Sequence, residues 1–325
     1  MNTRRRPDCG PRAGAARDGR PGTRRLLRSF VAAALWSLAT LACAVDIDAL
    51  WEYDNAAASE ARFRAALVDA AGDQRLELLT QIARTYSLRG RFDDAHRMLD
   101  EIQPALATAG PKVRARFLLE RGRTFNSSGA PERARPLFIQ AWDLARAARI
   151  DGLAVDAAHM VAITYRGTAA AVDWNRKGLA LARVSEDAKA RALVPAMLNN
   201  SAWDLHDMGR YAEALPLFEQ ALAEWRMRSR PAQIHFARWS VARCLRSLGR
   251  FPEALTIQLA LQKEDTERNA VDGYVLEEIA ELYDALGQQE EARSYYQRAA
   301  GALSADEDFV RDNPDRLARL RAKAR

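Results

Sequence analysis

Apolar residues recur at helical spacing from about residue 76 to residue 301, and turn signals containing glycine interrupt this pattern every 40 residues or so. The clearest unit runs from Gly209 to Ala221 and reads Gly-x-aromatic-x-x-Ala-x-x-x-aromatic-x-x-Ala. The glycine can end a first helix with a positive φ, and the later aromatic and alanine then share one face of a second helix. The pattern therefore predicts helical hairpins in which small alanines allow two helices to pack closely.

The same frame recurs along the chain. Its central alanines stand at positions 95, 134, 171, 214, 254 and 292, with spacings of 39, 37, 43, 40 and 38 residues. The third copy is degraded, because the interval from Tyr165 to Ala171 is about three residues too short. We therefore expect a tightened or irregular turn in that hairpin.

These copies resemble the tetratricopeptide repeat family over residues 76–301. The resemblance implies an all-α fold, a right-handed superhelical solenoid of about six antiparallel helix hairpins. Repeat arrays need caps with a polar outer face. We expect N-terminal capping helices in residues 45–75 and a C-terminal capping helix in residues 302–325.

The resemblance also implies that the first helix of each hairpin lines a concave surface. Counting back from each turn glycine, the inward positions of the first five hairpins are basic, aromatic or amide-bearing: Arg84, Arg116, Arg123, Asn126, His159, Arg166, Asn199, Trp203, His206, Trp239, Arg243 and Arg246. The sixth hairpin instead places Tyr274, Glu277, Glu281 and Asp284 there. The predicted groove is basic and aromatic in its middle and acidic at its C-terminal end.

Such a groove is suited to a peptide, because arginine binds carboxylates in a fork, tryptophan offers a large contact area, and asparagine can pair with a backbone amide. We hypothesise that the ligand is an extended or helical segment carrying Asp, Glu or a C-terminal carboxylate. The resemblance implies that Asn199 and Arg243 form part of a carboxylate clamp. Two alternatives stay open: the arginines pair with glutamates on neighbouring positions, and Trp203 and Trp239 pack between helices.

The net charge of +6 comes from the N-terminus. Residues 1–44 hold nine arginines and two aspartates, so the rest of the chain has 40 basic and 41 acidic residues. A body of that charge has no general attraction for phosphates, which argues against nucleic acid as a partner.

The run from Phe30 to Ala44 is apolar, uncharged and 15 residues long, which suits a signal-peptide core better than a membrane span. Ala42-Cys43-Ala44 supplies a small-x-small cleavage pattern. The sequence predicts a signal peptide in residues 1–44 and an exported protein, periplasmic or attached to the envelope of a Gram-negative bacterium. A lipidated Cys43, a twin-arginine signal at Arg24-Arg25 and an uncleaved N-terminal anchor are the alternatives, and a lipid or anchor is the only membrane contact expected.

No constellation of catalytic residues appears. The four histidines are scattered without a metal-binding spacing, and Cys244 lies in an apolar stretch typical of a buried cysteine. We therefore expect no metal, no cofactor and no enzyme activity. The predicted function is a non-catalytic adaptor or scaffold that binds a protein or an acidic peptide segment in the groove. The alternatives are a ligand-sensing module that acts on a separate protein, and an enzyme or an accessory subunit of one.

Overall fold

The computed structural model describes residues 46–325, which are helical throughout, contain no strand and belong to one compact unit. The predicted signal peptide and its cleavage site lie outside the described residues. The helices are the 3-10 helix η1 (Asp48–Leu50), α1 (Ala56–Ala66), α2 (Gly72–Leu88), α3 (Phe92–Ile102), the 3-10 helix η2 (Gln103–Ala107), α4 (Pro111–Ser127), α5 (Pro131–Ala147), α6 (Asp151–Ile163), α7 (Ala169–Val184), α8 (Ala188–Ala192), α9 (Val194–Asp207), α10 (Tyr211–Met227), α11 (Pro231–Ser247), α12 (Phe251–Glu267), α13 (Gly273–Ala285), α14 (Gln289–Ser304), α15 (Glu307–Asp312) and α16 (Pro314–Lys323).

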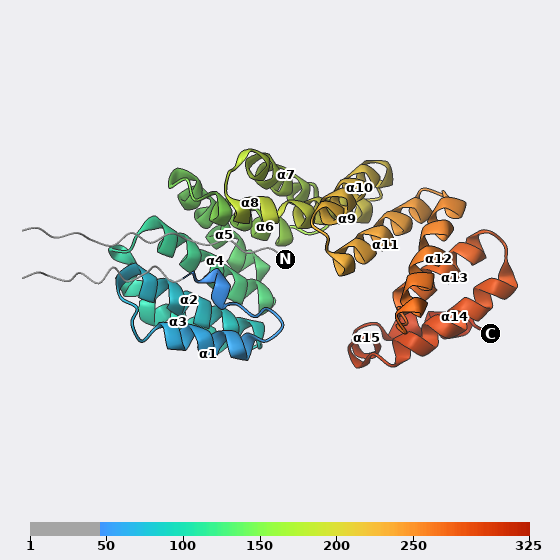
Figure 1. Cartoon of the computed structure of the whole chain (residues 1–325), viewed down its shortest axis with the longest axis horizontal. Coiled ribbons are helices and arrows are strands. Elements are labelled where there is room, and N and C mark those ends of the chain that lie inside the picture. The colour runs from blue at the N-terminus through green and yellow to red at the C-terminus, as the bar shows by residue number, and fades with distance from the viewer. Residues whose placement is uncertain (1–45) are drawn as a thin grey trace, which may run out of the picture. The chain divides into compact units, whose positions relative to one another are not determined.

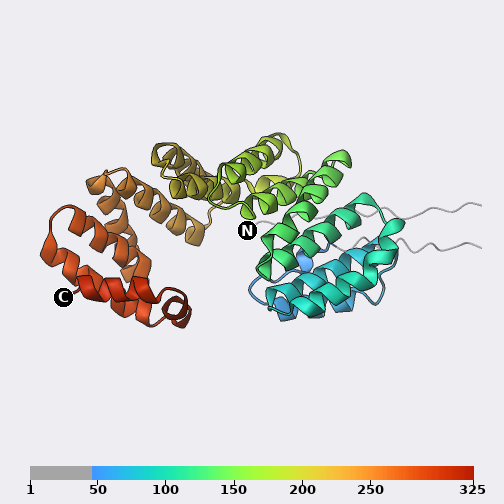
Figure 2. The ribbon, with the colours of Figure 1, turned by 180° about the vertical axis from the view of Figure 1, so that it is seen from behind.

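Six antiparallel hairpins make up the unit: α2–α3, α4–α5, α6–α7, α9–α10, α11–α12 and α13–α14. They follow one another in sequence order, with the second helix of one hairpin packed on the first helix of the next (Figures 1 and 2). The predicted all-α solenoid of about six hairpins is confirmed. Its first helix begins at Gly72 and its last helix ends at Ser304, compared with the predicted bounds of 76 and 301.

The turn glycines form the hairpins for the reason expected. Gly209 has a φ of 74°, a conformation that costs glycine little. The amide of Arg210 donates to the carbonyl of Leu205 at 2.8 Å, and that of Gly209 donates to His206 at 2.9 Å. These bonds satisfy carbonyls at the end of α9, as in a Schellman motif. The bond corresponding to that of Arg210 recurs after α2, α4, α11 and α13.

The third hairpin has a different turn: five residues separate α6 from α7, whereas three residues separate the helices of each other hairpin. Its turn glycine is Gly167, with a φ of 73°, and it stands four residues before the central alanine Ala171 instead of five. The amide of Gly167 donates to the buried carboxylate of Asp204 at 2.8 Å, which ties this turn to the next hairpin. Of the tightened or irregular turn that was expected, the structure has the irregular form, and the pattern with a spacing of five residues did not identify Gly167.

Small residues at the helix crossings allow the close packing. All six central alanines are 2% exposed or less. Gly122 of α4 meets the ring of Phe138 of α5 so closely that a Cβ added at Gly122 would lie 2.5 Å from that ring. Phe138 itself is fully buried. The core therefore runs between paired helices along the whole array.

Short helices close the two ends of the array. At the N-terminus α1 packs on α2, and at the C-terminus α15 and α16 pack on α14. The short helix α8 is an addition between the third and fourth hairpins and contacts α6, α7 and α9. Among residues 46–325, no helix combines the length and the apolar character that crossing a membrane requires.

Candidate functional site

Two cavities open on the side formed by the first helices of the hairpins, which we call the inner face. The N-terminal cavity has a volume of about 560 Å³ and is lined by residues of α2, α4, α6 and α8 and by residues that precede α1. The central cavity has a volume of about 360 Å³ and is lined mainly by α9, the end of α6, the turn after it and Phe236 of α11. The predicted inward positions fall on both.

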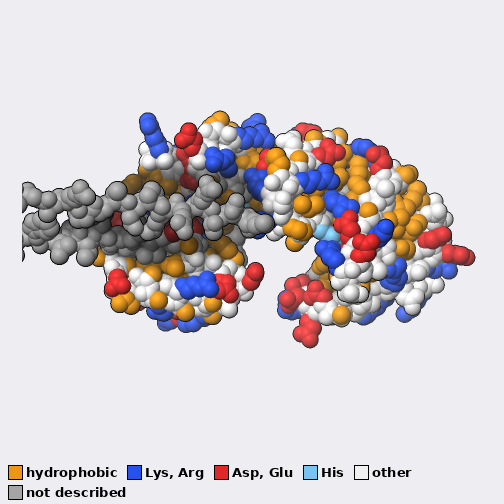
Figure 3. Space-filling model, viewed as in Figure 1, with side chains coloured by type: hydrophobic (Ala, Val, Ile, Leu, Met, Phe, Trp, Pro, Cys, Tyr) orange, Lys and Arg blue, Asp and Glu red, His pale blue; other side chains and the backbone are white. Residues whose placement is uncertain are grey.

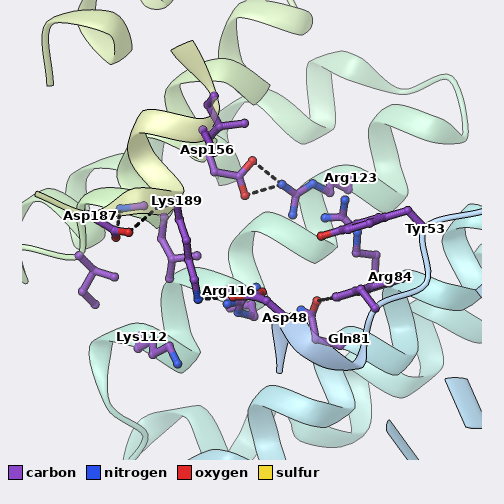
Figure 4. A pocket seen from close by; sticks show the side chains of 16 residues that line it. Asp48, Tyr53, Gln81, Arg84, Lys112, Arg116, Arg123, Asp156, Asp187 and Lys189 are labelled. Atoms are coloured by element: carbon purple, nitrogen blue, oxygen red, sulfur yellow. Dashed lines mark hydrogen bonds and ion pairs between the residues drawn. The ribbon is translucent and has the colours of Figure 1, made fainter. Parts of the chain in front are cut away.

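Arg84, Arg116 and Arg123 line the N-terminal cavity (Figure 4). Arg116 Nε lies 2.9 Å from Glu77 of the preceding hairpin. Arg123 lies 2.7 Å from Glu120 and donates to both carboxylate oxygens of Asp156 at 2.5 Å. Two of the three predicted arginines are thus paired with carboxylates inside the protein.

Burial and ion pairing oppose each other in this cluster. Burial acts to raise the pKa of Asp156, but the adjacent Arg123 guanidinium outweighs it and holds that pKa below its usual range. The same two effects act on Arg123, where burial is outweighed by Asp156 and Glu120 and the pKa is raised. Both groups therefore stay charged at neutral pH, and the Asp156 carboxylate depends on Arg123 for its charge.

Arg84 is the least well paired of these arginines. Its closest approach to a carboxylate is 3.5 Å, to Glu120, and its buried Nε has no hydrogen-bond partner. Burial, with the adjacent Arg123, lowers the pKa of Arg84. Its guanidinium carbon lies 5.4 Å from the ring centre of Trp51.

Trp51 belongs to a segment that covers this cavity, residues 46–53, which we call the N-terminal strap. Ile47 of the strap is buried, and Asp48 forms an ion pair with Lys189 of α8. The indole nitrogen of Trp51 donates to Gln81 at 3.0 Å. The strap thus connects the first hairpin with α8 across the inner face (Figure 4).

The central cavity brings together Arg166, Asn199 and Trp203, as expected, and adds Asn200 and Phe236, which were not predicted. Arg166 is exposed and forms no ion pair with residues 46–325, although Asp204 and Asp207 line the same cavity. Burial raises the pKa of Asp204, and the charge of Arg166 opposes that shift. The Oδ1 atom of Asn199 is buried and has no hydrogen-bond partner. Within the described residues, the cavity therefore offers a cation without an ion pair and an amide oxygen without a hydrogen-bond partner.

Aromatic side chains continue the inner face from this cavity. The rings of Trp203 and Trp239 lie 5.9 Å apart, and those of Trp239 and Phe236 lie 6.0 Å apart and nearly parallel. Phe236 is 48% exposed. The indole nitrogen of Trp239 donates to the carbonyl of Tyr274 at 3.3 Å. Trp203 and Trp239 are both half-buried, so each side chain packs against neighbouring side chains and also exposes part of its surface to solvent.

The remaining predicted polar residues lie beside these cavities and line neither of them. His206 is buried against Trp203 and Tyr211, and its Nε2 lies 2.9 Å from Ser247 Oγ. Asn126 is half-buried. His159 lies behind Asn200, with 2.9 Å between its Nε2 and the Asn200 amide nitrogen.

His159 gives a pH-dependent prediction. Burial lowers its pKa, opposed by Asp156 and reinforced by Arg123. A lowered histidine pKa means that the folded state favours the neutral ring, so the stability it contributes is present above the unfolded pKa of about 6.5 and is lost as the pH falls below it. We expect the free energy of unfolding, measured with urea, to fall between pH 7.5 and pH 5.5. His159→Gln should weaken this pH dependence. If the free energy of unfolding fell equally with pH in the variant and in the wild type, His159 would not be its cause.

The C-terminal end of the inner face is neutralised by the chain itself. Arg243 and Arg246 approach the buried Glu278 at 3.3 and 2.8 Å. Glu277 pairs with Arg316 of α16 at 2.6 Å, and Asp284 pairs with Lys323 of α16 at 2.9 Å. Figure 3 shows basic and acidic side chains intermixed over the C-terminal hairpins. Both the predicted acidic end and the predicted clamp residue Arg243 are therefore engaged within the protein.

The sequence carried signals for two residue groups that were missed. The acidic stretch Asp46–Asp54 supplies Asp48 to Lys189 of α8 and Glu52 to Arg62 of α1, and the basic face of α16 complements Glu277 and Asp284. Both were interpreted only as caps. Complementary charge between the chain ends and the inward positions was the available clue.

One cluster of the described residues could hold a metal ion. Ligand atoms of His235, Asp265 and Asp272 lie within 4.8 Å of one another. However, Asp265 also pairs with Arg268 at 2.6 Å, and Asp272 caps α13 by accepting from the Tyr274 amide at 2.8 Å. Because a guanidinium already neutralises Asp265, we assign no metal to this cluster.

Comparisons with known proteins agree with the hairpin frame. Family models described as tetratricopeptide repeat match residues 196–227 and 274–302, which correspond to α9–α10 and to most of α13–α14. No curated protein matches the chain.

Solved structures share the fold at low sequence identity. The apo form of RapI is 13% identical, with a TM-score of 0.64 over 77% of this chain and 72% of its own. NprR in complex with its cognate peptide NprX is 14% identical, with a TM-score of 0.52 over 81% and 77%. A signal transduction ATPase with a tetratricopeptide repeat sensor from Pyrococcus horikoshii is 13% identical, with a TM-score of 0.63; the match covers 82% of this chain and 43% of that one. At such identities the likeness shows the fold alone, and the hairpins and the two matched segments identify the chain as a tetratricopeptide repeat protein.

Proposed function

We propose that this chain is a non-catalytic interaction module that binds an extended peptide segment of a protein partner at the central section of the inner face. The observation that carries the proposal is the central cavity, where Arg166 and the Asn199 amide have unused binding capacity beside exposed aromatic surface. An asparagine amide can pair with a peptide backbone, and an arginine can bind a carboxylate. A peptide that supplies a hydrogen-bond donor to Asn199 would pair a buried polar atom that is otherwise costly to leave without a hydrogen bond.

The distribution of ion pairs favours the central section over the two ends. Arg116 and Arg123 are paired within the N-terminal cavity, and Arg243 and Arg246 are paired with Glu278. Binding a ligand carboxylate at those arginines would require breaking an existing pair. Arg166 requires no such exchange.

Two structural neighbours support a peptide ligand by analogy. NprR was solved with its cognate peptide, and a Rap protein, 17% identical with a TM-score of 0.54, was solved with the competence and sporulation factor. The ligand-sensing alternative makes a separate prediction: a small molecule or peptide would raise the melting temperature in the absence of a protein partner.

The test is site-specific photo-crosslinking from position 236, which is exposed beside the central cavity. We expect one dominant partner, and the affinity of the purified partner should fall at least about tenfold, roughly 1.4 kcal/mol, with Arg166→Glu. The matched control is Arg176→Glu, an equal charge reversal at an exposed site of α7, which should leave the affinity unchanged. Equal losses in both variants, or no capture by correctly folded protein, would contradict the proposal.

We further propose that the module works outside the cytoplasm, on the basis of the signal-like residues 1–44. Cell fractionation with N-terminal sequencing tests this: a mature protein beginning near Val45 supports cleavage. A full-length protein that stays in the cytoplasm would contradict export. Loss of membrane attachment in Cys43→Ala would identify a lipoprotein.

A further inference from the structure

The N-terminal strap is an acidic and aromatic segment that lies over the N-terminal cavity of the inner face. Residues 46–54 contain four carboxylates and no basic residue. The cavity they cover is lined outside the strap by two carboxylates, of Asp156 and Asp187, and by five basic side chains: Arg84, Lys112, Arg116, Arg123 and Lys189. The strap therefore has the kind of composition that was expected of a ligand for this groove.

Three anchors hold the strap, and each uses a different interaction. Ile47 is 5% exposed and packs in the core of the first hairpin. Asp48 pairs with Lys189. Trp51 donates to Gln81 and lies beside the Arg84 guanidinium. An apolar residue, a carboxylate and an aromatic ring are thus recognised at positions i, i+1 and i+4.

The strap leaves part of this site unfilled. The N-terminal cavity of about 560 Å³ lies between Asp48, Trp51 and Tyr53 of the strap and the helices of the first three hairpins. The buried Nε of Arg84 faces no hydrogen-bond acceptor. A segment with similar anchors and an additional acceptor could make contacts that the strap does not make.

We propose that the inner face of the first three hairpins is a second peptide site, specific for segments with an aromatic residue three positions after an aspartate, and that the strap occupies it in cis. A partner segment of this chemistry binds in trans when the strap leaves. The inference rests on the proposed function of the inner face as a peptide-binding surface, and it adds a second location and the chemistry of its ligand.

A tethered occupant masks such a site. Short flexible tethers give effective concentrations in the millimolar range, so the strap outcompetes a free segment of equal intrinsic affinity. The apparent dissociation constant for a segment in trans is the intrinsic constant divided by the fraction of molecules whose site is open. Weakening the strap should therefore strengthen binding in trans.

The experiment uses residues 44–325, which form one compact unit, and a fluorescein-labelled peptide with the sequence of residues 46–54. Fluorescence anisotropy measures peptide binding to the wild-type chain and to Asp48→Asn/Trp51→Ala. We expect the variant to bind the peptide at least about tenfold more tightly than the wild type. Circular dichroism and the melting temperature establish that the variant is folded. If the double variant fails to fold, Asp48→Asn alone keeps the Trp51 packing and should give a smaller gain in the same direction.

Charge reversals in the double variant locate the site. Lys189→Glu removes the ion-pair partner of the peptide carboxylate that corresponds to Asp48, and it should weaken peptide binding at least about tenfold. The matched control Lys177→Glu, at an exposed position of α7, should leave binding unchanged. A peptide of scrambled sequence, which keeps the charge and loses the spacing, should bind more weakly.

Two results would overturn the inference. If the peptide does not bind a folded strap variant, the strap is only a cap. If the peptide binds the wild type and the variant equally, its binding site lies elsewhere. The variant Arg166→Glu separates this site from the central section. It should leave the binding of this peptide intact even if the partner expected at the central cavity is never captured.

Discussion

Replacing Arg123 by methionine is expected to lower the free energy of unfolding by about 3–5 kcal/mol at pH 7.5, because it leaves buried carboxylates without their partner. The side chain of Arg123 is 13% exposed, that of Glu120 is 1% exposed and that of Asp156 is 23% exposed. Glu120 keeps only long contacts, to Arg84 at 3.5 Å and to the Gln81 amide at 3.4 Å, and Asp156 has no other ion pair among residues 46–325. Urea denaturation measures the loss.

The pH dependence of this loss tests its electrostatic cause. Without Arg123, burial raises the pKa of the Asp156 carboxyl, and protonation then removes the cost of an unpaired charge. The difference in the free energy of unfolding between the variant and the wild type should therefore become smaller as the pH falls from 7.5 to 5. Asp156→Leu in the Arg123→Met background should recover part of the stability at pH 7.5.

The matched control is Arg210→Met, which removes an exposed pair with Glu213. Exposed pairs contribute little, so the unfolding midpoint should stay unchanged. Equal losses for the Arg123 and Arg210 variants, or a gap that widens at low pH, would show that the buried cluster does not stabilise the fold in this way.

Adding a methyl group at Gly122 is expected to destabilise the protein by about 1–3 kcal/mol. The new Cβ would lie 2.5 Å from an edge carbon of the Phe138 ring, which is fully buried and cannot swing into solvent. The two helices of the second hairpin must therefore separate or the ring must leave its position. Thermal and urea unfolding of Gly122→Ala measure the effect.

Gly301 provides the matched substitution, since it also lies within a helix but has no atom within 4 Å of an added Cβ. There the change to alanine should stabilise the protein by about 0.5–1 kcal/mol, because it raises helix propensity without a clash. If Gly122→Ala were also stabilising, the close approach of α4 and α5 would not be required for the fold.

The hairpins could be predicted from the sequence because their signals are local. A turn glycine, an alanine five residues later and apolar residues at helical spacing all act within one hairpin. The same locality explains the error at the third hairpin. There Gly167 stands one residue nearer to Ala171, so the fixed spacing missed the glycine that makes the turn.

The candidate site was recovered in part by the same frame. Arg84, Arg116 and Arg123 line the N-terminal cavity, and Arg166, Asn199 and Trp203 meet at the central one, because residues that share a helix face also share its environment. Asn200 was missed because it adjoins the selected Asn199 and lies off that face. Phe236 was missed because the inward positions of α11 were counted back only to Trp239, although Phe236 stands seven residues before Arg243 on the same face. The binding role of each residue stays a prediction.

The sequence by itself determined which segments are helices, where the hairpins turn and which side chains face inward, since each depends on residues close along the chain. Only the tertiary structure decided which of those side chains remain open to a ligand. Arg243 is paired across hairpins with Glu278, Glu277 is paired with the distant Arg316, and the strap covers Arg84. An ion pair depends on the distance between two groups in space, and that distance is set when the hairpins and the chain ends pack together.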